Sequence, residues 1–339
     1  MQKACFRIHP CIGIARVGNS PEFVLAPESM TGMPETGDSA VVGGLPIRPG
    51  TDSTHITSVD LRDGSGALKR HAARFRIFAY PEELAGVYPS GAGQEIQIGT
   101  TIEGKAVKDI VWSVHLANKK ANWFILVEEG KKQGIDSYAA GLPPLRNWPT
   151  LAPDPQAKQP NDQERLKILN GTDRLKRFMI DPGPRTVSGA NAQPVSFDRD
   201  TPASYLGNSG EVVNAPNYPK SFPSDSFAEM DAPAGPISTL GELRTDEFGR
   251  LIVAGGYGRA VGWKVNGAPV QLDDDVNNDQ WFDDASDGPV SAVLVFEDGT
   301  RASVHGAWVT ATDPSYAPQI LNTVSLWDDI YDCWVRGME

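Results

Sequence analysis

Seven aspartates lie between Asp273 and Asp287, a density of carboxylates that could bind a metal ion or line the rim of a polar cleft. Calcium prefers several oxygen ligands, but the spacing departs from the EF-hand pattern and lacks its turn glycine. We therefore favour a solvated cleft rim and keep calcium as the alternative. Trp281 and Phe282 interrupt the acidic run, and two large aromatic side chains beside carboxylates indicate a folded wall.

The glycine-rich stretch GGYGRAVG precedes the acidic run and follows the β-branched residues RLIV at 250–253. Glycine tolerates backbone conformations in which other side chains clash, so the pattern predicts a strand that ends in a tight turn. The glycines at 256, 258 and 262 miss the G-x-G-x-x-G spacing of a dinucleotide-binding loop. The sequence also lacks GxSxG, HExxH and Walker A motifs, which leaves no basis for hydrolase, zinc-protease or P-loop functions.

The histidines show no recognisable catalytic pairing. His71 has four cationic neighbours in sequence, which we expect to disfavour its protonated form: Lys69, Arg70, Arg74 and Arg76. His115 stands between apolar residues and is expected to be a hydrogen-bonded core histidine rather than a catalytic base. His9 and His305 have no partner at a recognisable spacing. The sequence therefore predicts no catalytic residue and no metal ligand with a defined role.

The three cysteines, Cys5, Cys11 and Cys333, form no CxxC pair. An odd number without a nearby histidine pair argues against a disulfide framework or a structural zinc site. We expect buried free thiols.

Composition is that of an ordinary globular protein. The chain has 339 residues, and 31 basic against 43 acidic side chains give a formal net charge of −12. A surplus of negative charge argues against nucleic-acid and anionic-membrane partners. Arg7 and His9 interrupt the start where a secretory peptide needs an apolar core, and no run approaches the roughly 20 apolar residues of a membrane span. We expect a soluble protein, cytoplasmic or of undetermined location.

Glycine and proline, 34 and 27 residues, are spread evenly and favour many short strands joined by turns. The clearest hairpin is predicted from Ser291 to about Val309, where alternating apolar residues meet the turn Glu297-Asp298-Gly299-Thr300. The fold class expected is mainly β, within the α+β group, with short antiparallel strands, long Pro/Gly-rich loops and a C-terminal helix.

Two helices are predicted: a short one over ANKKANWF at 117–124, and a terminal one from about Ala317 to Val335 with apolar residues at three- and four-residue steps. Polar, Pro-rich stretches at 142–176 and from Tyr205 to about Gly235 are interpreted as long surface loops. We expect a single domain over 1–339, with a subdivision into 1–141 and 177–339 as the alternative.

Six sequence blocks resemble one family in the expected order. They are HPCIGIARVGNSPEFVLAPE (9–28), ALKRHAARFRIF (67–78), WSVHLANKKANW (112–123), IDPGPRTVSG (180–189), the stretch from Thr239 to Gly288, and DPSYAPQILNTVSLWDDIYDCWVRG (313–337). The chain resembles the amino-terminal half of the quinoprotein amino-acid oxidases of the L-lysine 6-oxidase and glycine oxidase family. Members of that family carry a cysteine tryptophylquinone made from their own side chains.

The resemblance implies an oxidoreductase that deaminates an amino acid with dioxygen and releases hydrogen peroxide and ammonia. It also implies a flavoprotein maturation factor, a homo-oligomer and a small amino-acid substrate as partners. In the family, the loop after the GGYG turn helps to wall the substrate entrance. The corresponding candidates for the cleft wall here are Trp263, Trp281 and Phe282.

The cysteine and tryptophan that form the quinone lie in the later half of the family's sequences, so the resemblance implies that this chain supplies scaffold and cleft walls but not the redox group. Cys333 adjoins Trp334, but consecutive helical residues point about 100° apart and do not face each other. By itself the chain is expected to be inactive and to need a C-terminal half or a partner chain. A truncation, a split gene and a remnant with another role are the three explanations left open. The alternative function is a non-catalytic β-rich module that binds a ligand or calcium.

Overall fold

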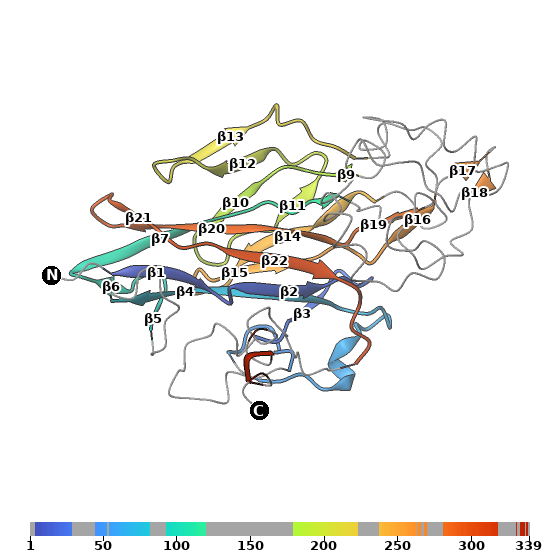
Figure 1. Ribbon diagram of the computed structural model, residues 1–339, viewed down its shortest axis with the longest axis horizontal. Helices are drawn as coiled ribbons and strands as arrows, with labels where there is room; N and C mark the ends of the chain where they lie inside the picture. Colours follow the sequence, from blue (N-terminus) through green and yellow to red (C-terminus); the bar gives the residue numbers. More distant parts are fainter. Residues whose placement is uncertain are drawn as a thin grey trace.

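A computed structural model describes residues 4–28, 45–52, 54–81, 93–119, 179–222, 237–262, 264–265, 268–269, 281–317, 330, 333–335 and 337. Strands dominate these residues (Figure 1), together with one short 3-10 helix, η2 (Ser58–Leu61). The strands are β1 (Cys5–His9), β2 (Ile12–Arg16), β3 (Phe23–Leu25), β4 (Arg70–Tyr80), β5 (Gln94–Ile96), β6 (Thr101–Ile102), β7 (Lys105–Val114), β8 (Asn118–Lys119), β9 (Met179–Ile180), β10 (Arg185–Ser188), β11 (Val195–Asp198), β12 (Ala203–Leu206), β13 (Val212–Ala215), β14 (Thr239–Thr245), β15 (Leu251–Ala254), β16 (Ala260–Gly262), β17 (Lys264–Val265), β18 (Ala268–Pro269), β19 (Trp281–Asp283), β20 (Ser286–Phe296), β21 (Arg301–Ser303) and β22 (Ala307–Thr312).

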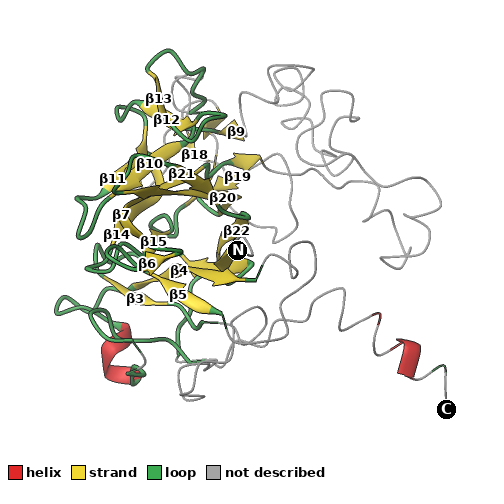
Figure 2. Cartoon of the chain, turned by 90° about the vertical axis from the view of Figure 1, so that its left-hand side faces the viewer, coloured by secondary structure: helices red, strands yellow, loops and turns green. Residues whose placement is uncertain are grey.

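A 14-stranded sheet forms the body of the fold, with the strand order β10-β7-β20-β22-β2-β4-β15-β14-β11 along its main path. Most neighbours are antiparallel, but β2 runs parallel to β22 and β3 runs parallel to β4. The sheet curls, because β10 at one end of this order contacts β11 and β14 at the other (Figure 2). The mainly β class is therefore confirmed, as a curled mixed sheet. Strands from both sides of residues 142–176 share it, since β7 pairs with β20 and β4 with β15.

The main hydrophobic core lies inside the curl and draws on strands from both ends of the chain. Phe75, Trp112, Leu251 and Val309 are fully buried members of this core. The indole of Trp112 also donates a hydrogen bond to the backbone oxygen of Gly249 at 2.8 Å, which satisfies its one polar group. Burial of these side chains from distant segments is what holds the sheet in its curl.

Strand β4 is buried on both faces, and its two faces differ in chemistry. Side chains alternate along a strand, so His71 and Phe75 face the inner side, while the arginines at 70, 74 and 76 face the outer side. Burial lowers the pKa of His71 to about 4, and the charge of Arg16, its partner in β2, adds to the effect. The direction expected from sequence is right, but its cause is not, because the neighbouring arginines lie on the opposite face.

The predicted hairpin is confirmed. The backbone N–H of Phe296 donates to the carbonyl of Thr300, and Gly299 adopts a φ of +80°, which glycine tolerates at little cost. The returning strand is interrupted, however, because β21 ends at Ser303 and β22 begins at Ala307. The break lets β22 insert between β20 and β2, where it adds a parallel neighbour to the sheet.

Three expectations are corrected by the structure. The helix predicted over 117–124 is wrong at its described start, because Asn118 and Lys119 form β8 and pair with β9; the rest of it lies outside the described residues. The loop predicted from Tyr205 begins as a hairpin instead, with β12 paired to β13. Cys5 is buried as expected, but the free thiols of Cys11 and Cys333 are exposed.

The terminal helix lies largely outside the described residues. Ile330 and Cys333–Val335 are helical, and Ile330 and Trp334 are exposed. The loop predicted at 142–176 also lies outside the described part of the chain. None of the described helical residues belongs to a segment with the length and apolar character that a membrane crossing requires.

Candidate functional site

The predicted glycine turn is confirmed and is built around Asp284. Strand β15 ends at Ala254, and Gly258 in the turn has a φ of +70°. A Cβ atom on Gly256 would lie 2.5 Å from a carboxylate oxygen of Asp284, far inside van der Waals contact. Glycine is therefore required at 256 because the carboxylate of Asp284, the residue that follows β19, occupies the space of a side chain.

Hydrogen bonds of Asp284 connect the two ends of the segment between β16 and β19. Its carboxylate accepts the backbone N–H of Arg259 at 3.0 Å, and its own N–H donates to the carbonyl of Arg259 at 3.1 Å. Burial raises the pKa of Asp284 to about 6, although backbone N–H groups of the turn favour the ionised form. With β16 paired to β19, these bonds close the base of the loop that was predicted to wall a cleft.

The described carboxylates of the acidic run are engaged within the protein. The amide of Asn118 donates to Asp283 twice, to the backbone oxygen at 2.7 Å and to Oδ1 at 2.9 Å. The indole of Trp308 donates to Asp287 at 3.2 Å. Within the described part of the chain, no group of three metal-binding side chains gathers. The four remaining aspartates of the run lie outside that part.

The structure describes the three cleft-wall candidates to different extents. Trp263 lies outside the described residues. Trp281 is the first residue of β19, and only its backbone is described. Phe282 is fully buried and packs into the main core. Its ring therefore supports the base of the loop from the inner side of the sheet.

A histidine–carboxylate pair that sequence reasoning missed lies where β7 ends. His115 Nε2 and Asp181 Oδ1 are 2.7 Å apart, and the phenol of Tyr218 donates to the other oxygen of Asp181 at 3.4 Å. The imidazole is 29% exposed, so it is not the enclosed core histidine that was expected. Tyr218 meets it edge-on, with ring centroids 5.9 Å apart. An imidazole held by a buried carboxylate can exchange protons with a neighbouring group.

Asp181 itself is fixed by the turn that follows it. The backbone N–H of Gly183 donates to Asp181 at 3.0 Å, and Gly183 has a φ of +83° with its Cα against the ring of Tyr218. Arg185, fully buried, donates to carbonyls on both sides, including those of Pro182 at 2.8 Å and Asp198 at 2.9 Å. The DPGPR stretch was a visible signal for this turn, but nothing in the sequence indicated that it meets residue 115.

A second polar cluster covers the outer face of β4, β15 and β14. Cross-strand register places Arg244, Ile252 and Arg74 in one row. Arg74 and Arg76 share the buried carboxylate of Glu28, with nitrogen–oxygen distances of 2.5 and 3.0 Å. Buried charges are tolerated only when they are paired in this way. The opposite charges of these arginines and Glu28 therefore stabilise the polar layer on this face.

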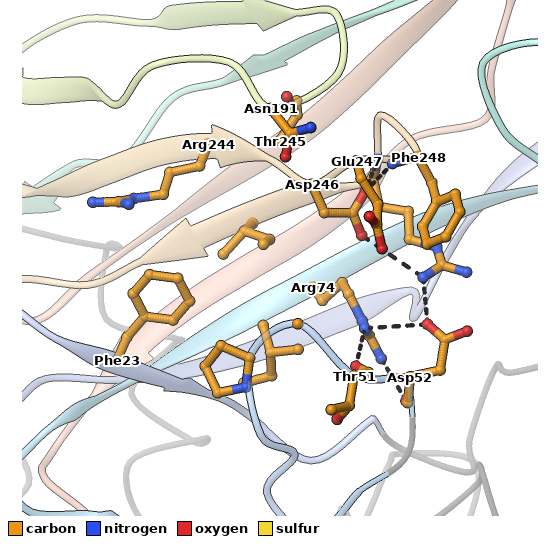
Figure 3. A pocket seen from close by; sticks show the side chains of 15 residues that line it. Phe23, Thr51, Asp52, Arg74, Asn191, Arg244, Thr245, Asp246, Glu247 and Phe248 are labelled. Carbon is orange, nitrogen blue, oxygen red and sulfur yellow. Dashed lines mark hydrogen bonds and ion pairs between the residues drawn. The ribbon is translucent and has the colours of Figure 1, made fainter.

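A half-open cavity of about 500 Å³ lies over this layer (Figure 3). Arg244 and Phe23 flank one side, and Arg74 and Asp52 flank the other. Arg250 donates to Asp52 at 2.5 Å and to Glu95 at 2.6 Å. Burial by itself lowers the pKa of Arg250, but the hydrogen bonds and charges of these two carboxylates outweigh it and raise the pKa above its ordinary value. Every guanidinium nitrogen of Arg74 and Arg250 already donates within the protein, so this side of the cavity is a network of charge pairs rather than an open anion site.

Comparison with known proteins identifies the family to which the chain belongs. Residues 9–311 match the family model described as L-Lysine epsilon oxidase N-terminal. The chain belongs to this family. L-lysine 6-oxidase from Marinomonas mediterranea is 32% identical over 338 residues, which is 98% of this chain and 37% of that protein.

Solved structures of the L-lysine epsilon-oxidase from the same organism are also similar to this chain. The structure of its Schiff base intermediate with L-Lys has a TM-score of 0.59 and 27% identity, and it covers 98% of this chain and 39% of that chain. A second crystal structure of the enzyme gives a TM-score of 0.57 and 28% identity over the same shares. The chain thus spans well under half the length of the L-lysine oxidases that it matches.

The cysteines of this chain do not fit the quinone cofactor that the family resemblance implies. Cys5 is buried in β1, and Cys333 is exposed. Cys11 is exposed and lies in the bend that precedes β2. No step of a quinone reaction is therefore derived from these side chains.

Proposed function

We propose that this chain forms the N-terminal β scaffold of a quinoprotein amino-acid oxidase and supplies walls of its substrate cleft. The observation that carries the proposal is the family match over residues 9–311. The reaction proposed is oxidative deamination of an amino acid with dioxygen, yielding hydrogen peroxide and ammonia. The cysteine tryptophylquinone would supply the electron-accepting carbonyl from polypeptide that corresponds to the rest of the L-lysine oxidases.

The closed loop base supports the cleft-wall role. Asp284 holds both ends of the segment between β16 and β19, and this segment contains Trp263 and ends at Trp281. An anchored base limits the positions that the aromatic side chains of the loop can reach, which favours a defined pocket over a floating loop. We propose that Trp263 and Trp281 line the substrate entrance and that Phe282 supports them from the core.

The partners proposed follow from the same role. They are the polypeptide that carries the quinone residues, a flavoprotein that matures the quinone, further copies in a homo-oligomer, and a small amino acid as substrate. A net charge of −12 supports the exclusion of nucleic acid and anionic membranes.

The test uses the native protein, isolated from its natural host through a tag on this chain. We expect quinonoid absorbance in the visible range, and peroxide release with L-lysine or glycine as substrate. Trp281→Ala should raise the KM for the amino acid, whereas Tyr205→Ala, on the exposed β12–β13 hairpin, should leave it unchanged. Native protein that has neither the absorbance nor peroxide release would refute the function, and calcium-dependent thermal stabilisation of such material would favour the binding module instead.

A further inference from the structure

Three neighbouring strands present an apolar row on the outer face of the sheet. Trp308 in β22 pairs with Pro289 in β20 on one side and with Ile12 in β2 on the other. Trp308 is 43% exposed and Ile12 is 50% exposed, and Pro289 is exposed as well. These three residues are termed the Trp308 row. Large apolar side chains aligned across adjacent strands form a patch, unlike single apolar residues scattered over a surface.

Packing on the inner face fixes the outward direction of the row. Val309, the residue after Trp308, is fully buried and pairs with Gly13 and Gly288. A side chain at Gly13 would overlap the ring of Phe75, and one at Gly288 would overlap the backbone of His115. The strands therefore cannot turn over to bury Trp308, because a one-residue slip would drive side chains into these occupied places.

The next row along the same face contains a carboxylate that holds the indole in place. Asp287 pairs with Thr310, and Thr310 pairs with Ile14. Asp287 accepts the indole N–H of Trp308 at 3.2 Å. The polar atom of the tryptophan is thus bonded within the chain, and its apolar ring is left as the contact surface. A ring anchored in this way is typical of an interface residue.

The Trp308 row lies beside the base of the proposed cleft loop. Strand β20 begins at Ser286, three residues after β19 ends at Asp283 and two after Asp284. A polypeptide bound to the Trp308 row would therefore lie next to the loop that carries Trp281. The outer face of β4, β15 and β14 is different, because it is already covered by Glu28, Asp52 and their neighbours.

We propose that the Trp308 row is the docking surface for the polypeptide portion that corresponds to the remaining three-fifths of the L-lysine oxidases. The proposal rests on the proposed function. Its grounds are that the chain covers 39% of the solved relatives' length and that its own thiols do not fit the quinone. The redox group must then be brought against the cleft loop by another portion, and the Trp308 row is the apolar surface next to that loop.

The exposed thiol of Cys11 reports whether the row is covered, because it directly precedes Ile12. In the native tagged protein, the covered thiol of Cys11 should not react with a maleimide. Trp308→Lys should restore the labelling, because a charged side chain cannot be buried in an apolar contact without a partner. Val59→Lys, at an 82% exposed position on η2, is the matched control and should leave Cys11 protected. Rapid labelling of Cys11 in the native wild type would overturn the proposal.

A photo-cross-linker placed at Ile12 identifies what covers the row. Cross-linked peptides that align with the later part of L-lysine 6-oxidase support the proposal. Peptides from residues 1–339 of a second copy, or no cross-link at all, overturn it. Absorbance and peroxide release are measured on the same preparation, so an active protein without this cross-link refutes the docking surface and leaves the oxidase function standing.

Discussion

Replacing Asp284 with asparagine should remove a pH-dependent loss of stability. The carboxylate is buried against the glycine turn, and its pKa of about 6 in the folded protein lies above its ordinary value of 3.8. The folded state therefore binds the proton more tightly than the unfolded state does. The stability that this proton contributes is fully present below pH 3.8 and is lost as the pH rises through about 6.

The size of the effect follows from the interval between the two pKa values. One pKa unit corresponds to about 1.4 kcal/mol, so the interval from 3.8 to about 6 corresponds to about 3 kcal/mol. Asparagine keeps the volume and an oxygen that can accept the N–H of Arg259, but it does not titrate. Part of this is already lost at pH 4, so we expect the unfolding free energy of the wild type, relative to Asp284→Asn, to fall by about 2 kcal/mol between pH 4 and pH 7.

Urea unfolding at a series of pH values, followed by tryptophan fluorescence, measures this difference. Asp298→Asn is the matched control, because hydrogen bonds from Lys105 and Thr300 lower the pKa of Asp298 to about 2, below the pH range tested. The wild type and this control should keep a constant difference over that range. If the difference between the wild type and Asp284→Asn is also constant, burial does not control the titration of Asp284 and the reasoning fails.

Three further substitutions test other contacts by the midpoint of unfolding. Gly256→Ala should destabilise the protein by about 1–3 kcal/mol because its Cβ meets Asp284, whereas Gly64→Ala, with open space around it, should have little effect; equal losses would contradict the close approach. Glu28→Gln should cost about 3–5 kcal/mol because two buried guanidinium groups lose their shared charge partner, and a neutral result would mean that the layer compensates otherwise. Trp112→Phe should cost about 1–3 kcal/mol because a buried carbonyl loses its donor, and an unchanged midpoint would mean that the bond adds nothing.

The two polar clusters have different physical roles. In the outer layer over β4, the charges of Arg74 and Arg76 are balanced by Glu28 at short distances, which suits a rigid support. His115 and Asp181, by contrast, form a pair whose imidazole is partly open to solvent. Such a pair can respond to a neighbouring group, whereas the arginine layer can respond only by breaking charge pairs.

Local patterns in the sequence were enough to predict a mainly β fold, the strand at 250–253 with the glycine turn after it, and the Asp298-Gly299 hairpin turn. These features depend on residues close together in the chain, namely an alternation with a period of two and glycines that accept a positive φ. The same local reasoning failed at 117–124, where helix-like residues are drawn into β8 by pairing with β9. A distant strand there outweighed a weak local preference.

Tertiary structure alone decided which polar groups meet and which are buried. Asp284 reaches Gly256 and His115 reaches Asp181 only because the curled sheet brings separate strands together. Register decided that His71 faces the core while the neighbouring arginines face the outer layer, and that Trp308 faces outward. A pKa or an exposed surface depends on everything packed around a group, and in this fold most of those neighbours come from remote parts of the chain.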